Sequence, residues 1–187
     1  MAEVDPVADI ECVESREVYR NSWLVLREDV IERPDGSRGI YGVVDKPTYA
    51  LVLPYDGDGG ERFHLVEQFR YPIGARRWEF PQGTAPDRID LEPRLLAERE
   101  LREETGLQAS TFEVLGTIDT APGLTTQRGW VLLATGIVAG EPAREHEEQD
   151  MRSAWFSRTD VEQMIRAGVI VDSQSIAAYG LFLLRHG

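Results

Sequence analysis

The chain has 187 residues, enough for one compact domain with a buried core. Apolar residues make up 42% and charged residues 28%, which is ordinary for a globular protein. The net charge of −13 argues against nucleic acid or an anionic membrane as a partner, because both attract basic surfaces.

The N-terminal residues 1–15 are acidic and lack the basic and apolar segments of a signal peptide. No apolar run approaches the length needed to cross a membrane. Cys12 is the only cysteine, so an intrachain disulfide is excluded and a reducing compartment is favoured. We therefore expect a cytoplasmic protein.

Alternating apolar and polar residues predict strands over 14–32, with a break near Asn21, and a return strand over 38–45. The segment 33–37, Arg-Pro-Asp-Gly-Ser, reads as the hairpin turn between them. Further strands are predicted over 49–54, 63–71, 78–83, 112–120, 129–139 and 154–157.

Two helices are predicted in the last part of the chain. Thr159 is the expected cap of a helix over 160–167, and Asp172 or Ser173 caps a final helix that runs to about Arg185. Strands with a few interposed helices, without regular βαβ alternation, predict the α+β class.

A third helix, ending at Gly106, gathers three carboxylates near its C-terminal end. Glu100 and Glu104 are four residues apart and share one helical face, and Glu103 lies beside them. Like charges at this spacing repel, and a hard divalent cation with oxygen ligands, such as Mg2+, offsets the repulsion. A solvated acidic face is the alternative, and spacing alone does not decide between them.

The segment 83–107 resembles the signature motif of the Nudix hydrolases. Residues 99–107, Arg-Glu-Leu-Arg-Glu-Glu-Thr-Gly-Leu, match every specified position in the second half of that motif. The first half departs, because Leu91 stands where the family has a Glu and the loop is two residues longer. Asp90 and Glu92 flank this position and are the candidates to replace the missing carboxylate.

This resemblance implies a Nudix fold, an α/β/α sandwich with a mixed sheet, and hydrolysis of a nucleoside diphosphate linked to another group. It implies Mg2+ or Mn2+ as the cofactor, with Glu100, Glu103, Glu104 and the carbonyl of Gln82 as ligands. Arg99 would pair with Glu103 and fix its orientation, and the alternative is an ordinary exposed ion pair.

In several Nudix subfamilies the general base is a Glu on a loop well after the motif. The acidic segment 144–150 lies where such a loop belongs, before the strand that contains Trp155. Glu148 is the first candidate for the base and Glu147 the second, because the reaction needs a carboxylate near a metal-bound water. An acidic loop with no catalytic role is the alternative.

Three segments resemble the ADP-ribose pyrophosphatase branch of the family. They are 65–70, 78–81 and the Pro122-Gly123 pair, about fifteen residues after the motif. An ordinary Pro-Gly turn is the alternative for the last of them. Gln127 stands where this branch often has an acid, which leaves the identity of the released group open.

Arg70 and Glu79 are the candidate binding residues before the motif. A guanidinium binds phosphate through a bidentate fork, so Arg70 is the expected phosphate contact, with a pair to Glu67 or Glu79 as the alternative. Glu79 is expected to contact a base or ribose, or to form a structural ion pair.

The same resemblance divides the chain into N-terminal antiparallel strands (1–45), which we expect to form a dimerisation sheet, and a hydrolase domain (46–187). It predicts a homodimer in which residues from Trp23 to Arg27 help to build the neighbour's pocket. The other three tryptophans are expected in the core.

The leading functional hypothesis is metal-dependent hydrolysis of ADP-ribose, or a related nucleotide sugar, to AMP and a sugar phosphate. The alternatives are a hydrolase of dinucleoside polyphosphates and, from another class, a Nudix-fold module that senses a ligand without cleaving it. The three glutamates of the motif favour an enzyme, whereas Leu91 and Gln127 leave room for a sensor.

Overall fold

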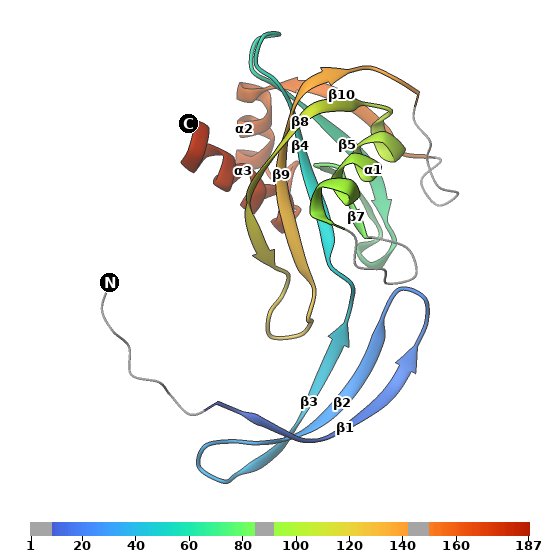
Figure 1. The fold of residues 1–187 in the computed structure, drawn as a ribbon, viewed down its shortest axis with the longest axis vertical. Coiled ribbons are helices and arrows are strands. Elements are labelled where there is room, and N and C mark those ends of the chain that lie inside the picture. Colours follow the sequence, from blue (N-terminus) through green and yellow to red (C-terminus); the bar gives the residue numbers. More distant parts are fainter. Residues whose placement is uncertain (1–8, 85–91, 142–149) are drawn as a thin grey trace.

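A computed structural model describes residues 9–84, 92–141 and 150–187 of the chain (Figure 1). Its strands are β1 (Glu11–Arg20), β2 (Val25–Glu32), β3 (Arg38–Asp45), β4 (Tyr49–Asp56), β5 (Arg62–Arg70), β6 (Ala75–Glu79), β7 (Gln82–Thr84), β8 (Gln108–Asp119), β9 (Arg128–Val138) and β10 (Arg152–Ser157). Its helices are α1 (Pro93–Thr105), α2 (Arg158–Arg166) and α3 (Ser173–His186), with the short 3-10 turn η1 (Tyr71–Ile73) after β5. None of these described helices is both long and apolar enough to cross a membrane.

The N-terminal strands β1, β2 and β3 form a separate antiparallel sheet, at the lower end of the molecule in Figure 1. The predicted break at Asn21 is a turn, where its side-chain oxygen accepts the N–H groups of Trp23 at 2.8 Å and Leu24 at 2.9 Å. The predicted hairpin between β2 and β3 is also present, with Gly36 at φ 78°. Only glycine adopts such a left-handed conformation without a steric penalty.

The larger sheet is mixed, with the strand order β10-β5-β4-β9-β8. Strands β4 and β9 are parallel, and the other pairings are antiparallel, including β6 on β5 and β7 on β4. The segment 78–83, predicted as a short strand entering a turn, belongs to two strands, β6 and β7. Pro81 separates them because it has no N–H for the strand ladder, so β6 and β7 pair with different neighbours.

Helices cover both faces of this sheet (Figure 1). Alternate residues of β4 point to opposite faces: Ala50 and Val52 pack with α1, whereas Leu51 and Leu53 pack with α2 and α3. Each fully buried leucine contributes about 1.5–3 kcal/mol relative to exposure. The predicted Nudix fold, an α/β/α sandwich of the α+β class, is therefore confirmed.

Local details correct two predictions. Ser157, not Thr159, caps α2: its hydroxyl accepts the N–H of Asp160, and the Asp160 carboxylate accepts the N–H of Ser157. This reciprocal pair satisfies two backbone groups, which a cap at Thr159 would not do. Trp23 lies in the turn after β1, not in a strand, and is 54% exposed. The tryptophans expected in the core are partly buried against it: Trp78, Trp130 and Trp155.

Candidate functional site

The acidic end of α1 is fixed by caps at both ends of the helix. The Glu92 carboxylate accepts the N–H of Leu95, and Gly106, in the left-handed conformation, donates its N–H to the carbonyl of Arg102. Glu92 therefore serves as a cap of α1. Glu100 and Glu104 lie on the face packed toward the sheet and are only 4% and 1% exposed. Burying two carboxylates on one face costs free energy unless cations or donors compensate their charge.

Strand β7 lies directly against these two carboxylates. The Gln82 N–H donates to Glu104 Oε2 at 3.2 Å. A Cβ atom at Gly83 would lie 2.2 Å from Glu100 Oε2, so only glycine leaves room for that carboxylate. The predicted ion pair of Arg99 is present: its Nε lies 2.9 Å from Glu103 Oε2, and a terminal nitrogen lies 3.6 Å from Glu100 Oε1.

The residues at this helix end fit a hard divalent cation. Carboxylate oxygens of Glu100 and Glu104 meet the backbone at Gln82, whose carbonyl is a further candidate ligand, and such oxygen donors are the ligands that Mg2+ prefers. Within the described residues, no three Asp, Glu, His or Cys side chains already converge on one point. Arg99 holds Glu103 through Oε2, so Oε1 is the oxygen that would bind an ion without breaking this pair.

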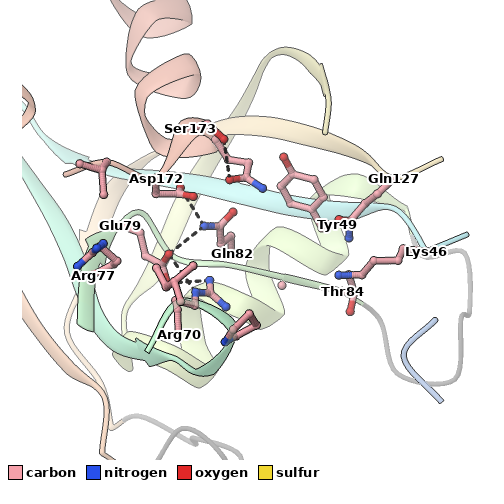
Figure 2. Close-up of a pocket in the computed structure, with 15 residues that line it drawn as sticks. Lys46, Tyr49, Arg70, Arg77, Glu79, Gln82, Thr84, Gln127, Asp172 and Ser173 are labelled. Carbon is pink, nitrogen blue, oxygen red and sulfur yellow. Dashed lines mark hydrogen bonds and ion pairs between the residues drawn. The ribbon is translucent and has the colours of Figure 1, made fainter. Parts of the chain in front are cut away.

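A pocket of about 530 Å³ opens on the other side of β7 (Figure 2). Gln82 and Gly83 line this pocket and also contact the acidic end of α1, so they connect the two features. The other lining residues come from three parts of the chain: the stretch from the end of β3 to β7, the residue before β9, and the start of α3 with the two residues before it. They are Lys46, Tyr49, Arg70, Pro72, Ile73, Arg77, Glu79, Thr84, Gln127, Val171, Asp172, Ser173 and Gln174.

Arg70 and Glu79 form an ion pair in the pocket wall. The shortest distance between their charged groups is 2.7 Å, and the Glu79 side chain is 2% exposed. Burial raises the pKa of Glu79 from its ordinary 4.5 to about 7, against the opposing effect of the Arg70 guanidinium, and Asp172 raises it further. Of the two partners considered for Arg70, Glu79 is the one it has.

The start of α3 forms a wall that sequence reasoning missed. Gln82 Nε2 lies 3.5 Å from a Glu79 oxygen and 3.2 Å from an Asp172 oxygen, so its amide bridges two carboxylates (Figure 2). Asp172 also caps α3, and the Ser175 hydroxyl accepts the N–H of Phe80 at 2.9 Å. The sequence identifies Asp172 as a cap, but nothing in it links α3 to a strand over 90 residues earlier.

Pro122 and Gly123 do not line the pocket. Their loop holds the N-terminal sheet instead, because the Tyr41 hydroxyl donates to the Gly123 carbonyl at 2.9 Å and Val44 bonds to Leu124. Gln127 does line the pocket and is 8% exposed. The predicted substrate contacts of Pro122 and Gly123 stay predictions.

Other predicted residues stay predictions. Trp23 lies outside the pocket lining of its own chain, and its predicted role concerns a neighbouring subunit. Glu147 and Glu148, the candidate bases, lie outside the described residues, as does Leu91.

Comparison with known proteins agrees with this geometry. Residues 45–178 match the model of the NUDIX domain, and residues 10–44 match that of the nucleoside diphosphate sugar hydrolase N-terminal domain. An ADP-ribose pyrophosphatase of Mycobacterium tuberculosis is 37% identical over 170 residues, 90% of this chain and 81% of that protein. A CMP-5'-(N-acetyl-N-hydroxy-3-aminopropyl)phosphonate hydrolase of Streptomyces rubellomurinus is 27% identical, over 84% of this chain and 74% of its own.

A solved structure, the crystal structure of an ADP compounds hydrolase, superposes with a TM-score of 0.80. The match covers 97% of this chain and 95% of that one. Sequence identity is 18%, so this likeness bears on the fold alone.

Proposed function

Because the chain belongs to the Nudix hydrolase family and is a Nudix pyrophosphohydrolase, we propose that it cleaves ADP-ribose or a related nucleotide sugar to AMP and a sugar phosphate. Members of this family generally use divalent metal cations, and we propose Mg2+ or Mn2+ here. The M. tuberculosis relative, an ADP-ribose pyrophosphatase, supports this choice of substrate.

One observation supports the proposal most: an acidic helix end and a pocket with cationic side chains lie on either side of Gln82 and Gly83. A diphosphate needs positive charge around it, since its own charge repels a nucleophile. A bound cation would neutralise phosphate charge and lower the pKa of a water molecule.

The chain's own residues supply positioning. In this proposal Glu100, Glu103, Glu104 and the Gln82 carbonyl hold the cation. Arg70 would present its guanidinium to a phosphate while Glu79 fixes its orientation through the 2.7 Å ion pair. Glu148, or else Glu147, would take the proton of the attacking water.

We also propose that the protein is a homodimer formed through the N-terminal sheet. Strand β1 is exposed along its whole length in the single chain, and exposed apolar side chains lie on this sheet, among them Val18, Tyr19 and Ile40. Exposed apolar side chains contribute to protein–protein interfaces, which is why we propose this sheet as the dimer surface. In such a dimer Trp23 would reach the partner's pocket and stack on the adenine.

The test is a panel of nucleoside diphosphate derivatives incubated with protein and Mg2+ or Mn2+ and scored for released monophosphate. It includes ADP-ribose, other nucleotide sugars and dinucleoside polyphosphates. We expect ADP-ribose to be cleaved with the highest kcat/KM and the activity to disappear on chelation of the metal. Binding without cleavage of any compound would support a sensing module and contradict the proposal.

Glu104→Gln tests the ligand assignment. The amide can still accept the Gln82 N–H but is a poor cation ligand, so we expect kcat to fall by on the order of 100-fold or more with folding retained. Glu98→Gln is the matched control, because Glu98 lies on the same helix, partly exposed and paired with Arg94. Full activity in Glu104→Gln would show that the assignment is wrong.

A further inference from the structure

Lys46 is a pocket residue to which the proposed function gives no role. It follows β3 directly, lines the pocket and is partly buried. In Figure 2 its side chain extends into the pocket at the end opposite Arg77, on the side of Thr84 and Gln127. Burial lowers the pKa of its ammonium group, and the nearby Arg70 guanidinium lowers it further.

Lys46 differs from the two arginines of the pocket in the partners of its charged group. Arg70 is paired with Glu79, and Arg77 donates to the backbone carbonyl of Arg76 at 2.8 Å. In the three described stretches of the chain, the Lys46 ammonium forms no ion pair. A partly desolvated cation beside a second cation is unfavourable unless an anion joins them. Carboxylates are abundant in this protein, whose net charge is −13, yet none of those described pairs with Lys46.

The backbone around Lys46 is firmly held by the loop before β9. The Lys46 N–H donates to the Thr126 hydroxyl at 3.3 Å, and Gln127 Nε2 donates to the Pro47 carbonyl at 3.3 Å. Two residues before Lys46, the Val44 N–H donates to the Leu124 carbonyl, and the Val44 carbonyl accepts the N–H of Thr126. Ordering the lysine on a ligand therefore costs side-chain entropy but little backbone entropy.

We propose that Lys46 is a substrate-binding residue that contacts an anionic group of the substrate, a phosphate or a carboxylate, and so determines which charge the pocket accepts at this end. The proposal rests on the proposed function, because the ligand is taken to be a nucleoside diphosphate derivative. The anionic group has two sources, the diphosphate itself or a further acid on the molecule, and the chemistry of contact is the same for both.

The first test measures binding, not turnover. The probe is ADP-ribose with a methylene group in place of the bridging diphosphate oxygen, titrated into protein with Mg2+ by calorimetry. We expect Lys46→Met to raise Kd by about tenfold or more, and Lys46→Arg to restore much of the affinity. The salt dependence of Kd should also weaken in Lys46→Met.

Two comparisons make this test specific. Arg166→Met removes the same charge from an exposed position on α2, where Arg166 pairs with Glu162, and should leave Kd unchanged. Adenosine carries no charge, so Lys46→Met should not change its binding. An equal loss for adenosine would overturn the proposal, as would an unchanged Kd for both the methylene analogue and its 2′-phosphate.

The second test separates the two sources of charge by kcat/KM on matched substrates. The pairs are ADP-ribose against its 2′-phosphate, and UDP-glucose against UDP-glucuronate. An equal loss on all four in Lys46→Met assigns Lys46 to the diphosphate, and a loss confined to the more acidic member of each pair assigns it to the additional acid. Equal activity of variant and wild type on all four would again overturn it.

Failure of the proposed function can be told from failure of this inference. If wild-type protein cleaves no nucleotide, inorganic pyrophosphate replaces the analogue as the binding probe, since it carries the charge without nucleoside or sugar. Weaker pyrophosphate binding in Lys46→Met then upholds the role of Lys46 while the proposed function fails. Conversely, normal turnover and binding in Lys46→Met would leave the enzyme assignment intact and reject the role of Lys46.

Discussion

Gly83 lines the pocket and also lies against the acidic end of α1. Its missing side chain is what allows a Glu100 oxygen to approach, since a Cβ would lie 2.2 Å from that oxygen. A carboxylate that must move would lose its position relative to Gln82 and Glu104. Glycine is therefore required here by the close contact and not by the backbone conformation, since the φ of Gly83 lies outside the left-handed range.

Gly83→Ala should consequently reduce activity more than stability. We expect kcat to fall by on the order of 10-fold or more, and the free energy of unfolding to fall by about 1–3 kcal/mol, as in other overpacked sites. Gly180→Ala in α3 is the control, because its Cβ would meet nothing within 4 Å; there we expect a gain of up to about 1 kcal/mol. Urea denaturation and steady-state kinetics measure both quantities, and unchanged kcat in Gly83→Ala would contradict the contact argument.

Glu79 should give the protein a stability that depends on pH. Its pKa is raised in the folded state from 4.5 to about 7, mainly by burial. Between these values the folded protein holds a proton that the unfolded chain has released, so stability falls as the pH rises through this window. The stability of wild type minus that of Glu79→Gln should drop by roughly 3 kcal/mol between about pH 4 and pH 8.

Denaturant unfolding in EDTA, which keeps metal ions out of the comparison, checks this prediction. The difference between the two proteins matters, because other carboxylates titrate equally in both. A difference that stays constant across the range would mean that Glu79 ionises at an ordinary pKa, with Arg70 offsetting its burial.

At the residue scale, the sequence predicted what a contiguous motif can encode. The ion pair of Arg99 with Glu103 follows from helical spacing, and it is present. Lys46 and Asp172 were missed as pocket residues because their place depends on contacts with segments about 80 or 90 residues away. No local pattern records such contacts.

Among the elements, α2 offers a direct test of a corrected cap. Ser157→Ala removes the hydroxyl that accepts the Asp160 N–H, and we expect it to lower the free energy of unfolding by about 1 kcal/mol. Thr159→Ala, one position inside the helix, should change it by less than about 0.5 kcal/mol. Thermal or urea unfolding of both variants decides the matter, and the reverse order of the two effects would restore Thr159 as the cap.

Most strands were predictable because alternation identifies a half-buried strand without knowledge of its neighbours. Strand pairing was not, since the parallel contact of β4 with β9 joins segments separated by the whole of α1 and β8. The division of 78–83 into β6 and β7 shows the same limit. Pro81 marks the division in the sequence, but the two partners, β5 and β4, are known only from the sheet.

For the whole molecule, the proposed dimer predicts complementation between two impaired variants. Trp23→Ala would damage the residue lent to a neighbour, and Glu104→Gln the site that receives it. If subunits are mixed and exchanged in equal amounts, half of the dimers are mixed, and one of their two sites is intact, so about one quarter of wild-type activity should return. Activity that stays at the level of the unmixed variants would contradict a shared pocket, and light scattering would show whether dimers form at all.

The hydrogen bond from Phe80 to Ser175 has a consequence for how the protein is made. Translation delivers the acidic helix long before α3, which contributes the last wall of the pocket. A nascent chain that has already folded its sheet around α1 still lacks Asp172 and its neighbours. Competence to hold a nucleotide thus requires α3, which leaves the ribosome after every described strand, and premature termination before α3 would remove this wall together with the core residues Ala178, Tyr179 and Phe182.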